Sequence, residues 1–175
     1  GRVLIFTRTK YRARNLARDL VKRGYRAEAL QGNMSQNKRQ RAIDGFRGKK
    51  YDILVATDVA SRGIDVLDIS HVINYDIPDD TDTYTHRIGR TGRADKTGEA
   101  FTFASSEDTQ MVLEIEQTIG ERIERRTLQD FKYGNFVPEK QFQRKYSKQK
   151  RSTLSRRRVR KRRNRTRSKK VHTSD

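Results

Sequence analysis

The chain contains no cysteine, which excludes a disulfide framework and a metal site built on thiolates. No apolar run approaches the roughly 18 residues that a membrane-spanning helix requires, so we expect no membrane partner. The first six residues lack Met and do not resemble a signal peptide. They begin directly on an apolar segment, so we expect the chain to derive from a longer protein. We also expect a cytoplasmic location, with a nuclear or nucleolar one left open.

Acidic residues are almost absent from the last fifth of the chain. Residues 141–175 contain 16 Lys and Arg and one acid, whereas residues 1–140 contain 25 Lys and Arg and 21 acids. The tail therefore holds +15 of the net charge of +19. Such a segment cannot bury enough apolar area to offset its ordering entropy, and it attracts polyanions. We predict a folded domain over residues 1–135 and a disordered basic tail over residues 136–175.

Short apolar runs predict buried strands. They lie at residues 3–6, 53–56 and 72–75, and residues 26–30 and 99–104 are predicted to form two further strands. Apolar residues at helical spacing predict helices between some of these strands. The first helix would bury Ala13, Leu16, Ala17, Leu20 and Val21, and Gly24 would end it. Ser35 would begin a second, burying Ala42, Ile43 and Phe46, and Ser106 a third, burying Val112, Ile115 and Ile119.

Strands that alternate with helices predict an α/β fold with a mainly parallel sheet. Such sheets bind ligands at the carboxyl ends of their strands. Two polar motifs lie just after apolar strands or in the loops that follow, at residues 57–65 and 86–93. Their position favours a functional role over a role in packing.

The segment at residues 86–93 reads His-Arg-Ile-Gly-Arg-Thr-Gly-Arg. Arginine offers a fixed charge and a planar fork of donors that fits phosphate oxygens. Glycine lets the backbone approach a ligand that a side chain would block. A solvated basic loop with ordinary turn glycines at Gly89 and Gly92 is the alternative for this segment taken alone.

Five segments together resemble the second RecA-like domain of DEAD-box RNA helicases, in order and with the expected gaps. Residues 5–10 resemble motif IV, residues 36–39 the Gln-x-x-Arg motif and residues 57–65 motif V. Residues 72–78 resemble motif Va and residues 86–93 motif VI. The resemblance covers residues 1–120 and implies a RecA-like three-layer sandwich. The His at position 86, where related families commonly have Gln, points to the DEAD-box branch.

The resemblance implies roles at the ATP site. Arg90 and Arg93 would act as arginine fingers on the γ-phosphate, where a fixed charge meets charge developing on the transferring group. Asp65 would accept a hydrogen bond from the ribose, with Gly63 beside it, and His86 would contact the acidic motif of a partner domain. Asp65 could instead cap a turn.

The resemblance also implies contacts with RNA phosphates. They would come from Thr9, Gly32, Arg39, Thr57 and Arg62. Contacts to the backbone alone would give little sequence specificity. Thr57 could instead be an ordinary hydroxyl at a strand end, and Arg39 could lie on a solvated helix face.

Neither a Gly-x-x-x-x-Gly-Lys-[Ser/Thr] loop nor an Asp-Glu-Ala-Asp run occurs in the chain. In this family both lie in the first RecA-like domain, which would bind most of the ATP and Mg²⁺. We therefore predict no metal ligands here, an inactive isolated chain, and an amino-terminal RecA-like domain as its partner. RNA is the expected substrate, with ribonucleoprotein or ribosomal assemblies as further candidates. A non-catalytic RNA-binding or scaffold module, and a DNA-directed helicase disfavoured by His86, are the alternatives.

Overall fold

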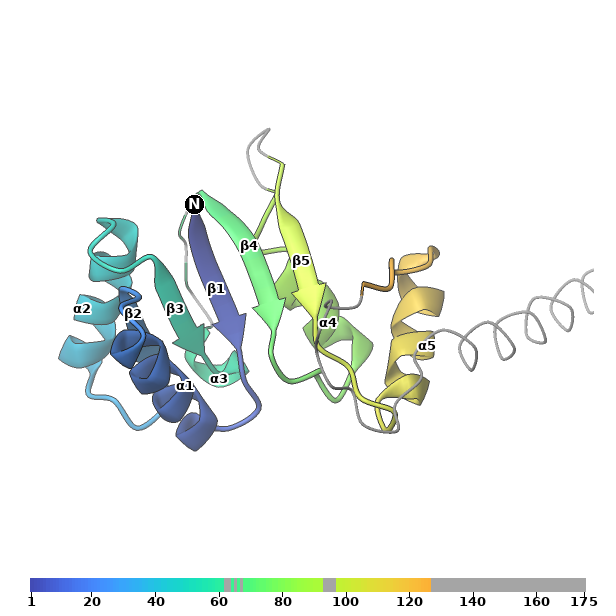
Figure 1. Ribbon diagram of the computed structural model, residues 1–175, viewed down its shortest axis with the longest axis horizontal. Helices are drawn as coiled ribbons and strands as arrows, with labels where there is room; N and C mark the ends of the chain where they lie inside the picture. Colours follow the sequence, from blue (N-terminus) through green and yellow to red (C-terminus); the bar gives the residue numbers. More distant parts are fainter. Residues whose placement is uncertain (62–63, 65, 67, 93–96, 127–175) are drawn as a thin grey trace, which may run out of the picture. The chain divides into compact units, whose positions relative to one another are not determined.

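The computed structural model describes residues 1–61, 64, 66, 68–92 and 97–126, and divides the chain into two units at residues 121 and 122. The predicted domain boundary at residues 135–136 and the whole basic tail lie outside the described residues. The first unit contains a five-stranded sheet with helices on both faces (Figure 1). Within the described residues, no helix is long and apolar enough to cross a membrane.

The strands are β1 (Arg2–Phe6), β2 (Ala27–Leu30), β3 (Ile53–Ala56), β4 (Ile69–Asn74) and β5 (Glu99–Thr102). The helices are α1 (Lys10–Lys22), α2 (Gln36–Arg47), α3 (Asp58–Ser61), α4 (Thr81–Ile88) and α5 (Thr109–Ile119). The strand order is β2-β3-β1-β4-β5, and every neighbouring pair is parallel. The predicted α/β class with a mainly parallel sheet is therefore confirmed.

The two faces of the sheet carry separate cores, because successive side chains of a strand point to opposite faces. On one face, Ala13 and Ala17 of α1 pack against Ile5 and Val55. On the other, the side chains of α2 and α3 pack against alternate strand residues such as Phe6. The second core contains the largest buried side chains, so it fixes α2 and α3 firmly against the strands.

Most sequence-predicted helix boundaries are confirmed by capping geometry. The Ser35 hydroxyl accepts a hydrogen bond from the backbone of Lys38, and so caps α2. Gly24 follows α1 with a φ of +87°, in the left-handed region that favours glycine. The prediction that Ser106 begins the third helix is wrong, since α5 begins at Thr109 after an N-cap at Asp108.

Two further sequence predictions need correction. Val21 is not part of the core, because it lies on the outer side of α1 and is 52% exposed. The segment at residues 86–93 does not lie wholly in a loop, because its first three residues complete α4. Sequence periodicity gave no helix there, since α4 is eight residues long with few apolar positions.

Parallel strands place all their carboxyl ends along one edge of the sheet. The chain leaves β2, β3 and β1 at that edge, where backbone hydrogen bonds join each strand end to the next: Thr57 N–H donates to Leu30, and Thr7 N–H donates to Ala56. The loops that contain Gly32, Thr57 and Thr9 therefore follow neighbouring strands.

Candidate functional site

The carboxyl edge brings together three residues predicted to contact RNA. Gly32 and Thr9 are exposed and Thr57 is half-buried. A Cβ atom added to Gly32 would meet no other atom within 4 Å, so packing inside the domain does not require glycine there. The open space at Gly32 lies where a ligand backbone would approach.

Thr9 is the N-cap of α1. Its Oγ1 accepts a hydrogen bond of 3.2 Å from the backbone N–H of Arg12. A hydroxyl that accepts one hydrogen bond still has its own proton and a second lone pair. The exposed Thr9 hydroxyl can therefore donate to a phosphate oxygen while it caps the helix.

Arg39 lies at the fourth position of α2 and is half-buried, and its role stays a prediction. No acidic residue lies in the first turn of α1 or of α2. Helix N-termini with free N–H groups and no nearby carboxylate attract anions. The start of α2 therefore presents a favourable electrostatic field to phosphate, whereas at the start of α1 the Asp76 carboxylate accepts from the backbone N–H of Arg8 and offsets part of that field.

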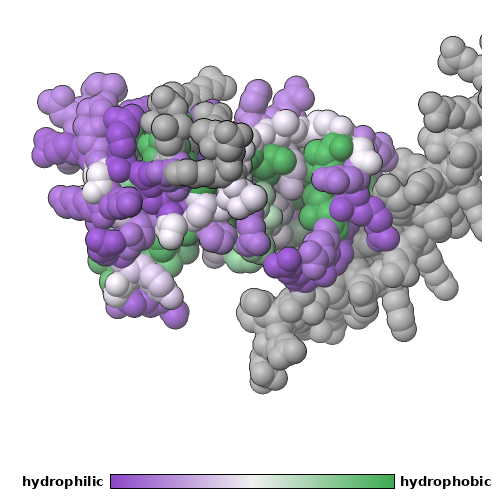
Figure 2. Space-filling model, turned by 90° about the horizontal axis from the view of Figure 1, so that it is seen from above, coloured by the Kyte–Doolittle hydropathy of each residue, from purple (hydrophilic) through white to green (hydrophobic). Residues whose placement is uncertain are grey.

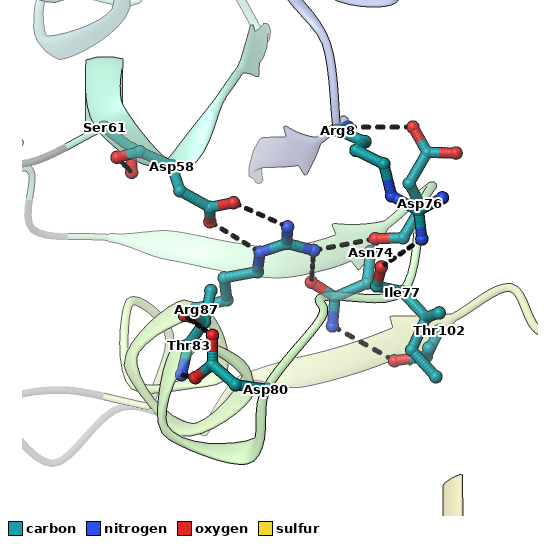
Figure 3. Close-up of polar contacts among 10 residues, drawn as sticks. All are labelled: Arg8, Asp58, Ser61, Asn74, Asp76, Ile77, Asp80, Thr83, Arg87 and Thr102. Carbon is teal, nitrogen blue, oxygen red and sulfur yellow. Dashed lines mark hydrogen bonds and ion pairs between the residues drawn. The ribbon is translucent and has the colours of Figure 1, made fainter. Parts of the chain in front are cut away.

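Arg87 is a buried residue to which sequence reasoning gave no role. It comes from α4, is 3% exposed, and donates to both carboxylate oxygens of Asp58, at 2.7 and 2.8 Å (Figure 3). Its Nη1 atom donates to the side chain of Asn74 and to the backbone carbonyl of Asp76, at 3.2 and 2.7 Å. The guanidinium also lies 5.1 Å from the ring centroid of Phe6. Four hydrogen bonds compensate for the desolvation of this cation.

Partners of Arg87 extend the network across the sheet edge. Asn74 donates to the Thr102 hydroxyl at 3.1 Å, which links β4 to β5. The Asp76 carboxylate accepts from the backbone N–H of Arg8 at 2.9 Å and forms an ion pair with Arg12. Arg8 and Arg12 flank Thr9, so a continuous polar chain connects α4 to the start of α1.

The sequence contained a signal for the orientation of Arg87. Tyr84, Arg87 and Ile88 have i, i+3, i+4 spacing, which places them on one face of a helix. Tyr84 is buried and Ile88 is half-buried, so this face packs inward. Recognising α4 from its N-cap, where Asp80 accepts from the Thr83 backbone at 2.7 Å, would have predicted a buried arginine.

His86 lies in the last turn of α4, and Arg90 follows the end of the helix. The His86 side chain is exposed, and Arg90 is half-buried. The Arg90 Nη1 atom donates to the backbone carbonyl of Ile64 at 3.1 Å. The segments at residues 57–65 and 86–93 are thus joined twice, through Arg87 to Asp58 and through Arg90 to Ile64.

Four predicted site residues lie outside the described residues. They are Arg62, Gly63, Asp65 and Arg93. The structure therefore brings Thr9, Gly32 and Thr57 to one edge and places His86 and Arg90 beside the Arg87 network. The roles of these residues as arginine fingers, in binding the ribose of ATP and in contacting RNA phosphates stay predictions.

Comparison with known proteins assigns this arrangement to a family. The model of the helicase conserved C-terminal domain matches residues 1–95. Over 116 residues the chain is 49% identical to DEAD-box ATP-dependent RNA helicase 21 of Oryza sativa subsp. japonica, covering 66% of this chain and 16% of that protein. The chain thus spans about a sixth of the length of this curated relative.

Solved structures agree with the sequence relatives. The E. coli DEAD-box protein SrmB, bound to regulator of ribonuclease activity A, superposes with a TM-score of 0.74 at 38% identity, covering 79% of this chain and 82% of that one. A DEAD box protein from Methanococcus jannaschii gives a TM-score of 0.65 at 42% identity, and the match covers 69% of this chain and 33% of that one. The RecA-like fold is thereby confirmed, and the chain belongs to the helicase conserved C-terminal domain family, in the form found in DEAD-box RNA helicases.

Proposed function

We propose that this domain supplies arginine fingers and RNA-backbone contacts to an ATP-dependent enzyme that unwinds short RNA duplexes. A separate RecA-like domain would carry the phosphate-binding loop and the carboxylates for Mg²⁺. The observation that supports the pairing of ATP and RNA contacts in this domain is the polar chain from Arg87 to the start of α1, because it links the helix that carries His86 to the residues around Thr9. Domain closure around both ligands would complete the catalytic constellation.

Arg90 and Arg93 are the proposed fingers. The single described hydrogen bond from the Arg90 guanidinium, to Ile64, uses one of five N–H donors, so others remain for a phosphate. His86 is exposed at the end of α4 and is available to contact the acidic motif of the other domain. Asp65 and Gly63 would contact the ribose. The Arg87 network fixes α4, which carries His86 and leads into Arg90, and such fixed placement is the preorganisation that electrostatic catalysis requires.

RNA would cross the carboxyl edge over Gly32, Thr57 and Thr9, with Arg39 and Arg62 beside them. These groups reach phosphate and ribose oxygens rather than base edges. We therefore expect binding with slight sequence preference.

Turnover measurements on the longer protein test the finger proposal. Arg93→Ala is expected to lower ATP turnover by on the order of 10³-fold or more while RNA affinity changes little. Arg90→Ala is expected to act similarly, with some loss of ATP affinity. Arg41→Ala, which removes an exposed arginine from α2, is the matched control. Near-normal turnover of the Arg93→Ala protein would refute the finger assignment.

The isolated 175-residue chain is expected to show no ATP hydrolysis, because it lacks a phosphate-binding lysine and the Mg²⁺ carboxylates. Adding the first RecA-like domain, in cis or at high concentration, should restore RNA-stimulated turnover. Specific hydrolysis by the chain alone would contradict the proposal. RNA binding without restored turnover would favour a non-catalytic scaffold module instead.

The basic tail is proposed to provide most of the RNA affinity of this chain. It would tether the enzyme near structured RNA and raise the effective concentration of nearby duplexes. Truncation after Glu139 should therefore weaken RNA binding strongly and make its salt dependence much shallower. If RNA affinity and its salt dependence stay unchanged, the tail is instead a solubility or localisation segment.

A further inference from the structure

A row of four cations runs along the outer side of α1. Lys10, Arg14, Arg18 and Lys22 follow one another at intervals of four residues over the whole helix. The last three are exposed and Lys10 is half-buried. Each step of four residues advances about 6 Å along a helix axis, so the row extends over roughly 18 Å. In Figure 2, hydrophilic side chains gather over the end of the domain that carries α1 and α2.

Acidic side chains do not neutralise this row. Within the described residues, no ion pair involves Lys10, Arg14 or Lys22, and Arg18 meets only Asp19, at 3.9 Å with both side chains more than half exposed. Other arginines of the domain, such as Arg2 and Arg12, form closer ion pairs with carboxylates. The row therefore presents its charge to solvent.

Helix stability does not account for the arrangement. Like charges at i and i+4 destabilise a helix by about 0.2–0.5 kcal/mol per pair. Lys10 also lies in the first turn, at the end of the helix where the backbone dipole disfavours a cation. A locally unfavourable pattern of this kind is expected at a binding surface, where a ligand supplies the compensating charge.

The row begins beside Thr9, which is the N-cap of α1 and a proposed RNA contact. A strand that crosses the carboxyl edge and leaves it at Thr9 would meet Lys10 first and then the remaining cations in order. The regular step of about 6 Å is similar to the spacing of phosphates along an RNA strand. Tyr11 is 64% exposed, with the Lys10 ammonium 5.3 Å from the centroid of its ring, and a base can stack on the face that Lys10 does not cover.

We propose that the outer side of α1 is an RNA-backbone track that continues the carboxyl-edge binding surface over three to four further phosphates. This rests on the proposed function, since it requires RNA at Thr9. The ligand is single-stranded RNA rather than an acidic protein, because the row starts beside the proposed RNA contact Thr9 and repeats a cation at about the spacing of backbone phosphates.

Photo-crosslinking of the complete 175-residue chain tests the track. The probe is 4-thiouridine-substituted oligouridylate of roughly 16 nucleotides, with a roughly 5-nucleotide oligomer for comparison. Arg14→Gln with Lys22→Gln removes two cations of the row. Arg41→Gln with Lys50→Gln is the matched control, because it removes one exposed Arg and one exposed Lys from the other side of the sheet. Thermal unfolding checks that both variants fold.

The wild-type chain should crosslink to α1 and to the segments containing Gly32 and Thr57. In the α1 variant, the yield of α1 crosslinks with the long RNA should fall about tenfold. Its RNA affinity should also fall, and the slope of log affinity against log salt concentration should be shallower by about 1.4, the value for two phosphate contacts on a single strand. The short RNA and the control variant should show neither change.

Crosslinks at Gly32 and Thr57 without any on α1 would overturn the track and leave the proposed function intact. Absence of crosslinks at the carboxyl edge as well would overturn both. An α1 variant that crosslinks as the wild type does would also overturn the track, and would favour an acidic protein as the partner of α1.

Discussion

Arg87 of α4 and the arginines of the α1 row are the same residue type in opposite environments. Arg87 is 3% exposed, and four hydrogen bonds hold its guanidinium against three neighbours. Arg14 is exposed, and within the described residues no acid pairs with it. A buried and fully bonded guanidinium fixes the fold around it, whereas an exposed one remains available to a ligand. Basic residues in a helicase domain therefore cannot be assigned to RNA by charge alone.

Removal of Arg87 should give the largest effect on stability. Arg87→Ala leaves the Asp58 carboxylate and the Asn74 oxygen without their donor, and should lower the free energy of unfolding by about 3 kcal/mol. This loss of stability lies at the low end of the range for breaking a buried ion pair, because the Asp58 side chain is 39% exposed and water can solvate it once Arg87 is removed. Urea unfolding of the wild type and the variant measures this difference in the free energy of unfolding. Arg87→Lys keeps the charge but not the fork, so it should recover only part of the loss.

A double-mutant cycle sharpens the same contrast. Combining Arg87→Ala with Asp58→Ala should give a coupling energy of about 2 kcal/mol, since the two side chains share two charge-assisted hydrogen bonds. The exposed pair Arg47–Asp44, at 3.4 Å, is the reference, and its cycle should give about 0.3 kcal/mol. Equal coupling in the two cycles would show that burial does not strengthen the Arg87 pair.

The N-cap residues of α4 and α1 differ in whether they titrate, so the contribution of only one of them to stability should depend on pH. The Thr83 backbone N–H, and then the Thr83 hydroxyl, lower the pKa of Asp80, the N-cap of α4. A lowered folded-state pKa means that Asp80 stabilises the domain above its usual pKa of about 4, and that this contribution is lost as the pH falls through the lower folded-state value. Asp80→Asn keeps a capping oxygen but cannot titrate.

Urea midpoints at neutral and acidic pH measure the effect. The wild type should lose more stability on acidification than the Asp80→Asn variant does. Parallel curves for the two proteins would contradict the role of Asp80. Thr9 caps α1 without a titrating group, so its variants should not change the pH profile.

The smallest effect is expected from the exposed row. Arg14→Gln with Lys22→Gln should leave stability unchanged or raise it by a few tenths of a kcal/mol, because it removes like-charge pairs at i and i+4. Thermal unfolding at low salt checks this. A loss of more than about 1 kcal/mol would mean that these side chains hold the fold, as Arg87 does, and are not free for RNA.

Sequence patterns predicted the sheet and most helices because β1 and β3 are mainly apolar runs and because Ser35 and Gly24 mark helix ends. The patterns failed at two positions. Val21 has helical spacing but faces solvent, and Ser106 was predicted to begin the last helix although the true N-cap is Asp108. The motifs predicted Thr9, Gly32 and Thr57 as one surface, and the parallel strand order brings them to one edge. Their ligands stay predictions, as do the roles of Arg62, Gly63, Asp65 and Arg93.

The sequence by itself determined the α/β class, the uneven charge and the motifs that identify the family, because these depend on residue type and local spacing. Only the tertiary structure decided which arginines are structural and which are exposed. Arg87 of α4 meets Asp58, 29 residues away in the chain, because Asp58 begins α3 at the carboxyl end of β3 and α4 follows β4 in the same sheet. Such long-range contacts depend on strand order and helix packing, which no local pattern encodes.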